Sequence, residues 1–470
     1  MVKPTKPQRL PGGRVTRVAP LVGLAGRTAG EMVVASLRNR RRGQRDNQWD
    51  GVEFHTRNAE RYAERLGRSR GVLMKAGQIL SVVMPESAVS SEYRGIYQAA
   101  FAKLQDDAPP MPVEIAIDTI TAELGRSPAE LFAEFDEHPL AAASIGQVYT
   151  ARMPDGRRVV IKVQYPGVEE AIRADLKNTE LLSTFLQLLF TMMPDVTSVD
   201  VRAMAHEISE RIGEEIDYRI EATNQREFAD AFRGHPFVHI PEVLPELTTR
   251  RVLTMEFVDG LRYAKAVTAE QELRDRWGEA IYRFTAASMR SLRLVNTDPH
   301  PGNYLFHPDG SVTFLDFGCV KRFTEEQARV LIGLLQRVVD QDAEGLYQWS
   351  IESGFLNPVD PPTPADLLGW WSASYQYLLA PQPFTFTPEY LTATMRNRLS
   401  STGPYNQVLR KLSSPGEYTM ASRMDIGVTA VLTGLRATGD WNAIRNEWYH
   451  DEPPTTEYGE LEAAFWARWR

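Results

Sequence analysis

The chain has 470 residues, of which 43% are hydrophobic and 24% are charged, so it can bury one large core or two beneath an ordinary soluble surface. Its single cysteine, Cys319, excludes an internal disulfide and a cysteine-based zinc site, and it favours a reducing compartment such as the cytoplasm. No apolar run reaches the ~18 residues of a membrane-spanning helix, and we expect any membrane contact to be peripheral.

Charge is distributed unevenly along the chain. Residues 1–45 contain 11 Lys and Arg but one acid, whereas the remaining residues contain 42 Lys and Arg against 60 Asp and Glu. We expect residues 1–50, which are also rich in Gly and Pro, to form a mobile basic tail. The tail is either simply solvated or bound to an anionic partner, for which we expect a membrane surface rather than nucleic acid.

Residues 51–134 have helical periodicity and predict a helical extension ahead of a sheet. The stretch 113–133 is expected to be helical, with interruptions at Gly125 and at Ser127-Pro128. Within this extension, Lys75 and Gln78 lie on an amphipathic segment. By themselves these two residues indicate only a close helix contact and a solvated lysine.

The next part of the chain predicts strands. Leu140–Ala151 and Arg158–Gln164 are expected to be antiparallel strands joined by a turn at Pro154-Asp155-Gly156. Two long helical stretches, 168–190 and 200–231, come next, and Arg251–Phe257 is expected to be a buried strand. The stretches 268–295 and 324–350 are expected to be helical, as is most of the chain beyond 360.

The most specific signal lies in a short block after these helices. Asp298 and Asn303 have the D-x-x-x-x-N spacing of a kinase catalytic loop, and Asp316 opens a D-F-G sequence. Between them, the apolar stretches 304–306 and 312–315 predict the two strands of a hairpin. The hairpin would bring Asn303 and Asp316 to one edge, where both could hold Mg²⁺ between the phosphates of ATP.

Lys162 lies in the β-branched stretch Val159–Val163, where a charged side chain is costly unless it meets a partner. Kinases place such a lysine against the α- and β-phosphates of ATP and pair it with a helix glutamate. The alternative is a strand lysine that reaches solvent. Four acids compete as the partner, and spacing alone cannot choose among Glu214, Glu215, Asp217 and Glu221.

Two segments are candidates for nucleotide contact. Ala141, Ala142, Ala143 and Ser144 occupy the position of a Gly-rich loop; because alanine disfavours positive φ, we expect a stiffer loop that approaches phosphates differently. An ordinary strand and turn is the alternative. The second segment runs from Glu256 to Val258, at the expected end of a strand, where backbone groups could meet the edge of adenine.

The order of elements predicts an α+β, bilobal, protein-kinase-like fold. A small antiparallel-sheet N-lobe would span 135–258 and a helical C-lobe 259–470, with the helical extension in front.

Together these features resemble the AarF/UbiB family of atypical, protein-kinase-like proteins, whose eukaryotic members support coenzyme Q synthesis. The resemblance spans roughly residues 70–320. The matching motifs are Lys75-Ala76-Gly77-Gln78 (K-x-G-Q), Leu104–Asp107, Ala141–Val148, Lys162–Gly167, Glu215–Tyr218, Glu221-Ala222, Asp298–Asn303 and Asp316–Gly318. The K-x-G-Q motif together with the alanine loop is highly specific, because ordinary protein kinases have neither.

The resemblance implies roles for several residues. Glu221 would be the partner of Lys162, and Glu215 and Asp217 would meet the K-x-G-Q segment, so that Lys75 and Gln78 gate the site. It also implies ATP and Mg²⁺ as cofactors. The implied activity is ATP hydrolysis or small-molecule phosphorylation tied to isoprenoid or quinone-precursor lipids at a membrane.

Two other classes of function stay open, a protein serine/threonine kinase and a nucleotide-binding scaffold without turnover. A protein kinase needs an activation segment with an A-P-E sequence, but the residues after Gly318 lead directly into an expected helix. A scaffold would not need Lys162, Asp298, Asn303 and Asp316 together. An aminoglycoside-type phosphotransferase would share the D-x-H-P-G-N loop but would not explain K-x-G-Q. Protein partners are left open.

Overall fold

The computed structural model describes residues 111–143, 145–176, 213, 216–399, 403–413 and 415–468. The expectations for the basic tail, for most of the helical extension with Lys75 and Gln78, and for Ser144, Glu214 and Glu215 lie outside the described residues. Among the helices that are described, none is both long enough and apolar enough to cross a bilayer.

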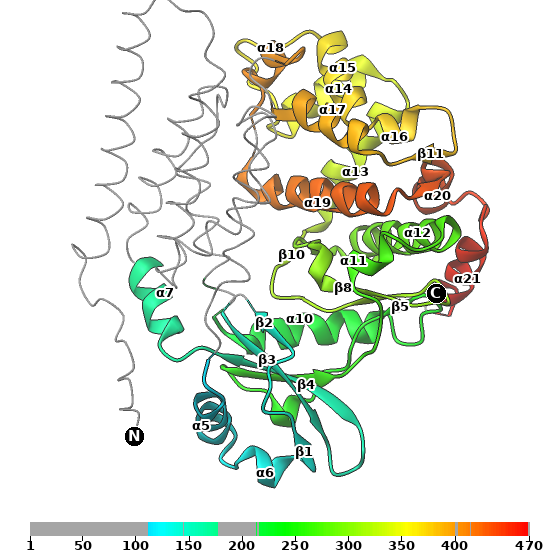
Figure 1. Cartoon of the computed structure of the whole chain (residues 1–470). Coiled ribbons are helices and arrows are strands. Elements are labelled where there is room, and N and C mark those ends of the chain that lie inside the picture. The colour runs from blue at the N-terminus through cyan, green and yellow to red at the C-terminus, as the bar shows by residue number, and fades with distance from the viewer. Residues whose placement is uncertain are drawn as a thin grey trace, which may run out of the picture.

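The first lobe is built on an antiparallel sheet (Figure 1). Its strand order is β1-β3-β4-β6, and β2 also pairs with β3. The strands are β1 (Glu134–Phe135), β2 (Ala141–Ala143), β3 (Gly146–Arg152), β4 (Arg158–Gln164) and β6 (Val252–Glu256). The strands predicted over 158–164 and 251–257 are therefore confirmed. In β4 the side chains of Val159, Ile161 and Val163 are buried on one face, as the period of two requires.

Helices α5 (Val113–Leu124) and α6 (Pro128–Leu131) pack their buried side chains with those of β3 and β4 in one hydrophobic cluster. The predicted interruption is confirmed: Gly125 ends α5 in the left-handed region at φ 72°, and Ser127 with Pro128 starts α6.

One prediction for the sheet was wrong. Leu140–Ala151 is not a single strand but a hairpin of β2 and β3, in which Ala143 pairs with Gly146. The reversal is possible because Gly146 lies directly against β4: a Cβ on this residue would lie 2.2 Å from Val163 O.

Helices α7 (Val168–Leu176) and α10 (Tyr218–Ala231) follow the sheet. The helical stretch predicted over 200–231 is confirmed over Tyr218–Ala231 as α10, while most of residues 200–215 lie outside the described residues. The stretch is interrupted where the chain turns at Ile216, and α10 begins with the Asp217 side chain accepting from the Arg219 amide. Gln164, at the end of β4, donates to the carbonyl oxygen of Ile216 at 3.0 Å. This bond fixes the start of α10 beside the sheet, and Figure 1 shows α10 between the sheet and the second lobe.

The second lobe is mainly helical. Its longer helices are α12 (Gln271–Ala287), α13 (Glu325–Val339), α14 (Ala343–Glu352), α15 (Pro364–Ser374), α17 (Pro388–Leu399), α19 (Thr419–Leu435), α20 (Trp441–Tyr449) and α21 (Glu457–Trp466). The shorter ones are α11 (Tyr263–Ala266), α16 (Gln376–Leu379) and α18 (Asn406–Leu409), and β11 (Phe384–Thr385) pairs with β12 (Thr438–Gly439). The predicted helical character beyond 360 is confirmed.

Short strands lie where the two lobes meet. The predicted hairpin is confirmed as β8 (Tyr304–Phe306) and β9 (Val312–Phe314), and β5 (Val238–His239) pairs parallel to β9. The helix predicted over 268–295 ends earlier, in a π-helical turn at 288–292. Arg293 then adopts a left-handed conformation, and β7 (Leu294–Asn296) follows and pairs with β10 (Val320–Arg322).

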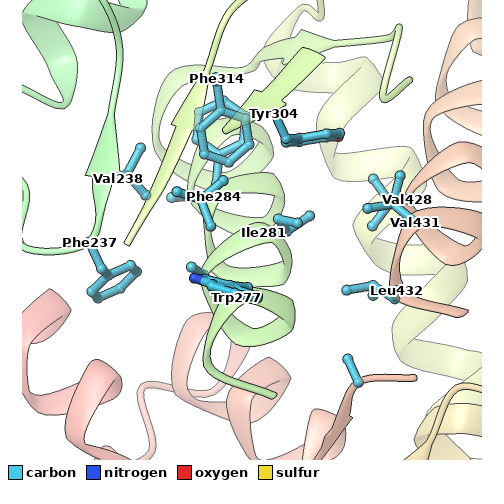
Figure 2. Close-up of a cluster of buried hydrophobic side chains, with 14 of the residues drawn as sticks. Phe237, Val238, Trp277, Ile281, Phe284, Tyr304, Phe314, Val428, Val431 and Leu432 are labelled. Carbon is cyan, nitrogen blue, oxygen red and sulfur yellow. The ribbon is translucent and has the colours of Figure 1, made fainter. Parts of the chain in front are cut away.

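An aromatic-rich cluster joins α12, the site hairpin and α19 in the second lobe. Figure 2 shows Trp277, Ile281 and Phe284 of α12 between the hairpin residues Tyr304 and Phe314 and the side chains of α19. The rings of Phe284 and Phe314 are stacked with centroids 3.9 Å apart. The hairpin that precedes Asp316 is thus fixed to the body of the lobe.

Candidate active site

Lys162 lies on the less buried face of β4, opposite the core residues of that strand. Its Nζ donates to Glu221 Oε1 at 2.5 Å and lies 3.5 Å from Asp316 Oδ2. The lysine and glutamate side chains are 13% and 9% exposed. Burial alone would lower the pKa of Lys162, but the nearby charges of Asp316 and Glu221 outweigh it and hold the pKa well above its usual range.

Glu221 is the acid that spacing could not choose. It lies on the first turn of α10, whose start is fixed to β4 by Gln164, and this placement aims its carboxylate at the lysine. Of its competitors, Asp217 lies one turn earlier and is engaged by Arg219, while Glu214 and Glu215 lie outside the described residues.

The loop from Asp298 to Asn303 is braced by its own groups. The Asn303 side-chain amide donates to Asp298 O at 3.0 Å, and His300 Nδ1 accepts from the Gly302 amide at 3.1 Å. The His300 amide in turn donates to Asp298 O at 2.7 Å. His300 therefore shapes the loop, and Asn303 keeps its side-chain oxygen available for another contact.

The hairpin returns the chain beside this loop. The Leu315 amide donates to Asn303 O at 2.9 Å, so Asn303 and Asp316 lie at one edge, as predicted. The Asn296 side chain bonds to both segments: it donates to Asp316 O at 2.6 Å and accepts from the Asp298 amide at 3.0 Å. Sequence reasoning missed Asn296, although its place two residues before Asp298 was a signal.

The donor set at this edge suits Mg²⁺. The Asp316 carboxylate is 35% exposed and the Asn303 side-chain oxygen is the atom left over from its bond to the loop. Mg²⁺ is commonly held by one or two protein oxygens together with substrate phosphates. Asp316 and Asn303 fit that pattern, and Lys162 beside them fits a phosphate.

Arg423 is a second residue that sequence reasoning missed. It lies on α19, 125 residues after Asp298 in the chain, and its Nη2 donates to Asp298 Oδ1 at 2.5 Å. No pattern near the catalytic loop could have indicated it, because the contact depends on how the last helices pack.

The segment after the D-F-G sequence is short and paired. Val320, Lys321 and Arg322 form β10 against β7, and Thr324 already caps α13. Arg322 binds Glu227 on α10 at 2.6 Å. Asn224 on the same helix donates to Phe317 O at 3.1 Å. The helix that carries Glu221 is thereby tied to the segment that carries Asp316.

The structure describes most of the two segments that are expected to contact the nucleotide. Ala141, Ala142 and Ala143 form β2, with Ala142 exposed, while Ser144 lies outside the described residues. The Glu256 amide donates to Glu242 O and the Phe257 amide to Arg158 O, so of these groups only carbonyl oxygens and the Val258 amide are left for adenine. The Glu256 side chain turns to His239, whose hydrogen bond lowers the pKa of that carboxyl.

The residues expected to gate the site are only partly described. Asp217 forms a bidentate pair with Arg219, with distances of 2.9 and 2.6 Å, and its hydrogen bonds to Arg219 lower the pKa of the carboxyl. Its predicted partners Lys75 and Gln78, and its neighbour Glu215, lie outside the described residues.

The α+β fold has two lobes, and it pairs a strand lysine with a helix glutamate next to a D-x-x-x-x-N loop and a D-F-G hairpin. This combination defines a protein-kinase-like fold. Within that class, residues 103–350 match the model of the ABC1 atypical kinase-like domain. This is more than half of the chain, and the chain belongs to that family, as its motifs predicted. Membership of a kinase-like family implies a nucleotide site.

Comparisons with individual relatives point to the same family. The chain is 31% identical over 320 residues to the mitochondrial atypical kinase COQ8 of Saccharomyces cerevisiae, which covers 68% of this chain and 62% of that protein. It is 33% identical over 320 residues to the chloroplastic protein ACTIVITY OF BC1 COMPLEX KINASE 1 of Arabidopsis thaliana, covering 67% of this chain and 45% of that one. In both cases the match spans less than two thirds of the relative.

A solved structure is similar over most of the fold. It is a complex of Rv3197 with erythromycin from Mycobacterium tuberculosis. The TM-score is 0.60 with 29% sequence identity, over 79% of this chain and 90% of the other. The likeness supports the predicted α+β architecture with an antiparallel N-lobe sheet and a helical C-lobe.

Proposed function

We propose that the chain is a Mg²⁺-dependent ATPase or small-molecule kinase that supports isoprenoid-quinone or related lipid metabolism at a membrane surface. The observation that carries the proposal is the contact of Lys162 with both Glu221 and Asp316. This contact joins the phosphate-binding lysine, its helix partner and the metal-binding acid of a kinase site at one point.

The chemistry is a transfer of the γ-phosphoryl group. Lys162, held by Glu221, would orient the α- and β-phosphates, and Asn303 and Asp316 would hold Mg²⁺, which would supply charge neutralisation on the phosphates. Asp298 orients water or a small hydroxyl and takes its proton as the new P–O bond forms and the bond to ADP breaks. The products are ADP with either phosphate or a phosphorylated small molecule.

In this proposal, two backbone segments contact the nucleotide. The Glu256 carbonyl and the Val258 amide would meet adenine, and Ala141 to Ser144 would cover the phosphates. The support is positional, since β2 and β3 form a hairpin one strand away from Lys162.

The K-x-G-Q segment would gate the site. We propose that Lys75 and Gln78 approach Glu215 and Asp217 at the start of α10. Asp217 lies one turn ahead of Glu221 on that helix, so a contact there could shift the acid that holds Lys162.

The segment after Gly318 disfavours a protein kinase. A peptide substrate needs a platform beside the γ-phosphate, but here the chain pairs with β7 at once and enters α13 at Glu325. A small acceptor or water needs no such platform. The lipid assignment rests on the family resemblance.

Asp316→Asn tests the assignment. We expect phosphate release from Mg-ATP to fall by ~10²–10⁴-fold, because a positioned metal-binding carboxylate is lost. The control is Asp309→Asn, the same substitution in the turn of the same hairpin, where Asp309 Oδ1 accepts from the amide and the hydroxyl of Ser311. Turnover should be measured with and without liposomes that contain isoprenoid-quinone precursors. Equal activity of the wild type and Asp316→Asn would contradict the assignment, and nucleotide binding without turnover would favour the scaffold.

A further inference from the structure

Helix α19 lies beyond the residues that match the family domain, yet it packs directly on the loop of Asp298. Arg423 Nη2 donates to Asp298 Oδ1, and the side chains are 10% and 30% exposed. One turn later, Gly427 faces Pro299: a Cβ on Gly427 would lie 2.4 Å from Pro299 Cγ. Only glycine allows the helix and the loop to approach this closely.

The same guanidinium also reaches the segment after the D-F-G sequence. Arg423 Nη1 lies 3.9 Å from Cys319 Sγ, directly after Gly318. Thr297, next to Asp298, donates from its hydroxyl to Cys319 O at 3.0 Å. Arg423 therefore spans the two loops that carry Asp298 and Asp316.

We propose that Arg423 is a positioning residue that holds the Asp298 carboxylate in the orientation in which it meets the attacking water or hydroxyl. The planar, permanently charged guanidinium fixes Oδ1 by a charge-assisted hydrogen bond. The other oxygen, Oδ2, accepts a long hydrogen bond of 3.5 Å from Asn303 Nδ2, and in this proposal Oδ2 is the oxygen that faces the nucleophile. The inference rests on the proposed function, because it assigns a role to Asp298, and it makes α19 part of the active centre.

A purely structural ion pair is the competing explanation, and the chain provides a matched control. Arg398, on α17, donates to Asp425 Oδ2 at 2.6 Å, and these side chains are 10% and 20% exposed. Asp425 lies on α19, two residues after Arg423. The two arginine pairs are alike in length and burial, but Arg398 is bonded to Asp425 rather than to the Asp298 loop.

The test compares Arg423→Ala, Arg423→Lys and Arg398→Ala in the full chain, with turnover expressed per folded molecule. We expect Arg423→Ala to lower kcat for ATP by about 10²-fold with KM unchanged, because a misplaced catalytic group loses most of its effect. Arg423→Lys should recover part of this loss, and added guanidinium should partly restore Arg423→Ala. Arg398→Ala should lose thermal stability but keep its kcat.

A double variant tests whether Arg423 acts through Asp298. If it does, Asp298→Asn with Arg423→Ala should be no slower than Asp298→Asn alone. Multiplied losses, or equal kcat losses in Arg398→Ala and Arg423→Ala, would overturn the inference. If the wild type turns over ATP and Arg423→Ala keeps the same kcat, the inference about Arg423 is overturned but the proposed function is not. If the wild type neither binds nor turns over the nucleotide, the proposed function is overturned as well.

Discussion

Lys162 shows how a single residue links the sheet to the site chemistry. Its β-branched neighbours fill the core of the first lobe, while its own side chain emerges on the opposite face between Glu221 and Asp316. A lysine that is only 13% exposed is stable there because two carboxylates face it. The phosphates of bound ATP would be further anionic partners of Lys162.

Sequence reasoning at this scale found residues that lie in a recognisable motif. Spacing indicated Asp298, Asn303 and Asp316, and a lysine in a β-branched strand ahead of that block indicated Lys162; the structure brings these residues into one region. Glu221 was found only through the family resemblance, because four acids on one helix look alike. Arg423 was missed, since an ion pair that spans 125 residues leaves no local pattern.

His307, in the turn of the site hairpin, makes stability depend on pH. Burial lowers the pKa of His307, His239 adds to the shift, and Asp309 opposes it. A histidine with a lowered folded-state pKa binds protons less readily than in the unfolded chain. Its contribution is therefore complete above the ordinary pKa of about 6.5 and is lost as the pH falls through the folded-state pKa.

We expect His307→Gln to flatten the loss of stability as the pH falls below about 6.5. Urea unfolding at several pH values measures this slope. The control is His138→Gln, which removes a histidine whose side chain is 96% exposed. An identical slope in His307→Gln and the wild type would contradict the assignment.

At the scale of elements, the pattern of strands was predictable and the reversals were not. A β-branched run after a turn identified β4, a buried apolar run identified β6, and the hairpin of β8 and β9 follows from its turn residues. The reversal between β2 and β3 was missed because its cause is the close approach of Gly146 to β4, a contact between strands. The break before α10 was missed because Asp217 acts as a cap only when the chain turns at Ile216.

Gly146→Ala should destabilise the first lobe by about 1–3 kcal/mol, because the new methyl group would meet the backbone of β4. Backbone atoms cannot move aside as the end of a flexible side chain can. Denaturant unfolding gives the change in the free energy of unfolding. Gly416→Ala, where a Cβ meets nothing within 4 Å, is the matched control. Equal stabilities of the two variants would show that β2 and β3 do not depend on this contact.

At the scale of the whole molecule, a buried charge cluster fixes the last helices to the body of the second lobe. Arg283 on α12, whose side chain is fully buried, binds Glu447 on α20 at 2.7 Å and Glu462 on α21 at 3.0 Å. Glu279, one turn earlier on α12, is bound at 2.7 Å. The fold class was predictable from the order of elements, but this cluster was not. The lobe boundary near 258 and the extension boundary near 134 stay predictions.

Arg283→Met should cost about 3–5 kcal/mol of stability, because it leaves buried carboxylates without their cation. Chemical unfolding of the full chain measures the change. The control is Arg157→Met, which removes a surface pair with Asp155 whose side chains are 62% and 50% exposed, and we expect it to cost far less stability than Arg283→Met. A small effect of Arg283→Met would mean that the cluster contributes little to holding α20 and α21.

We infer above all that Lys162, Asn303 and Asp316 form a Mg-nucleotide site. Nucleotide-dependent stabilisation of the full chain tests this inference most directly. With Mg²⁺ and a non-hydrolysable ATP analogue at 100 times its Kd, the wild type should gain about 2.7 kcal/mol of stability. The gain should require Mg²⁺, persist in Asp309→Asn and be lost in Asp316→Asn. A wild type whose melting temperature does not respond to the nucleotide, or an Asp316→Asn variant that responds equally, would contradict the account.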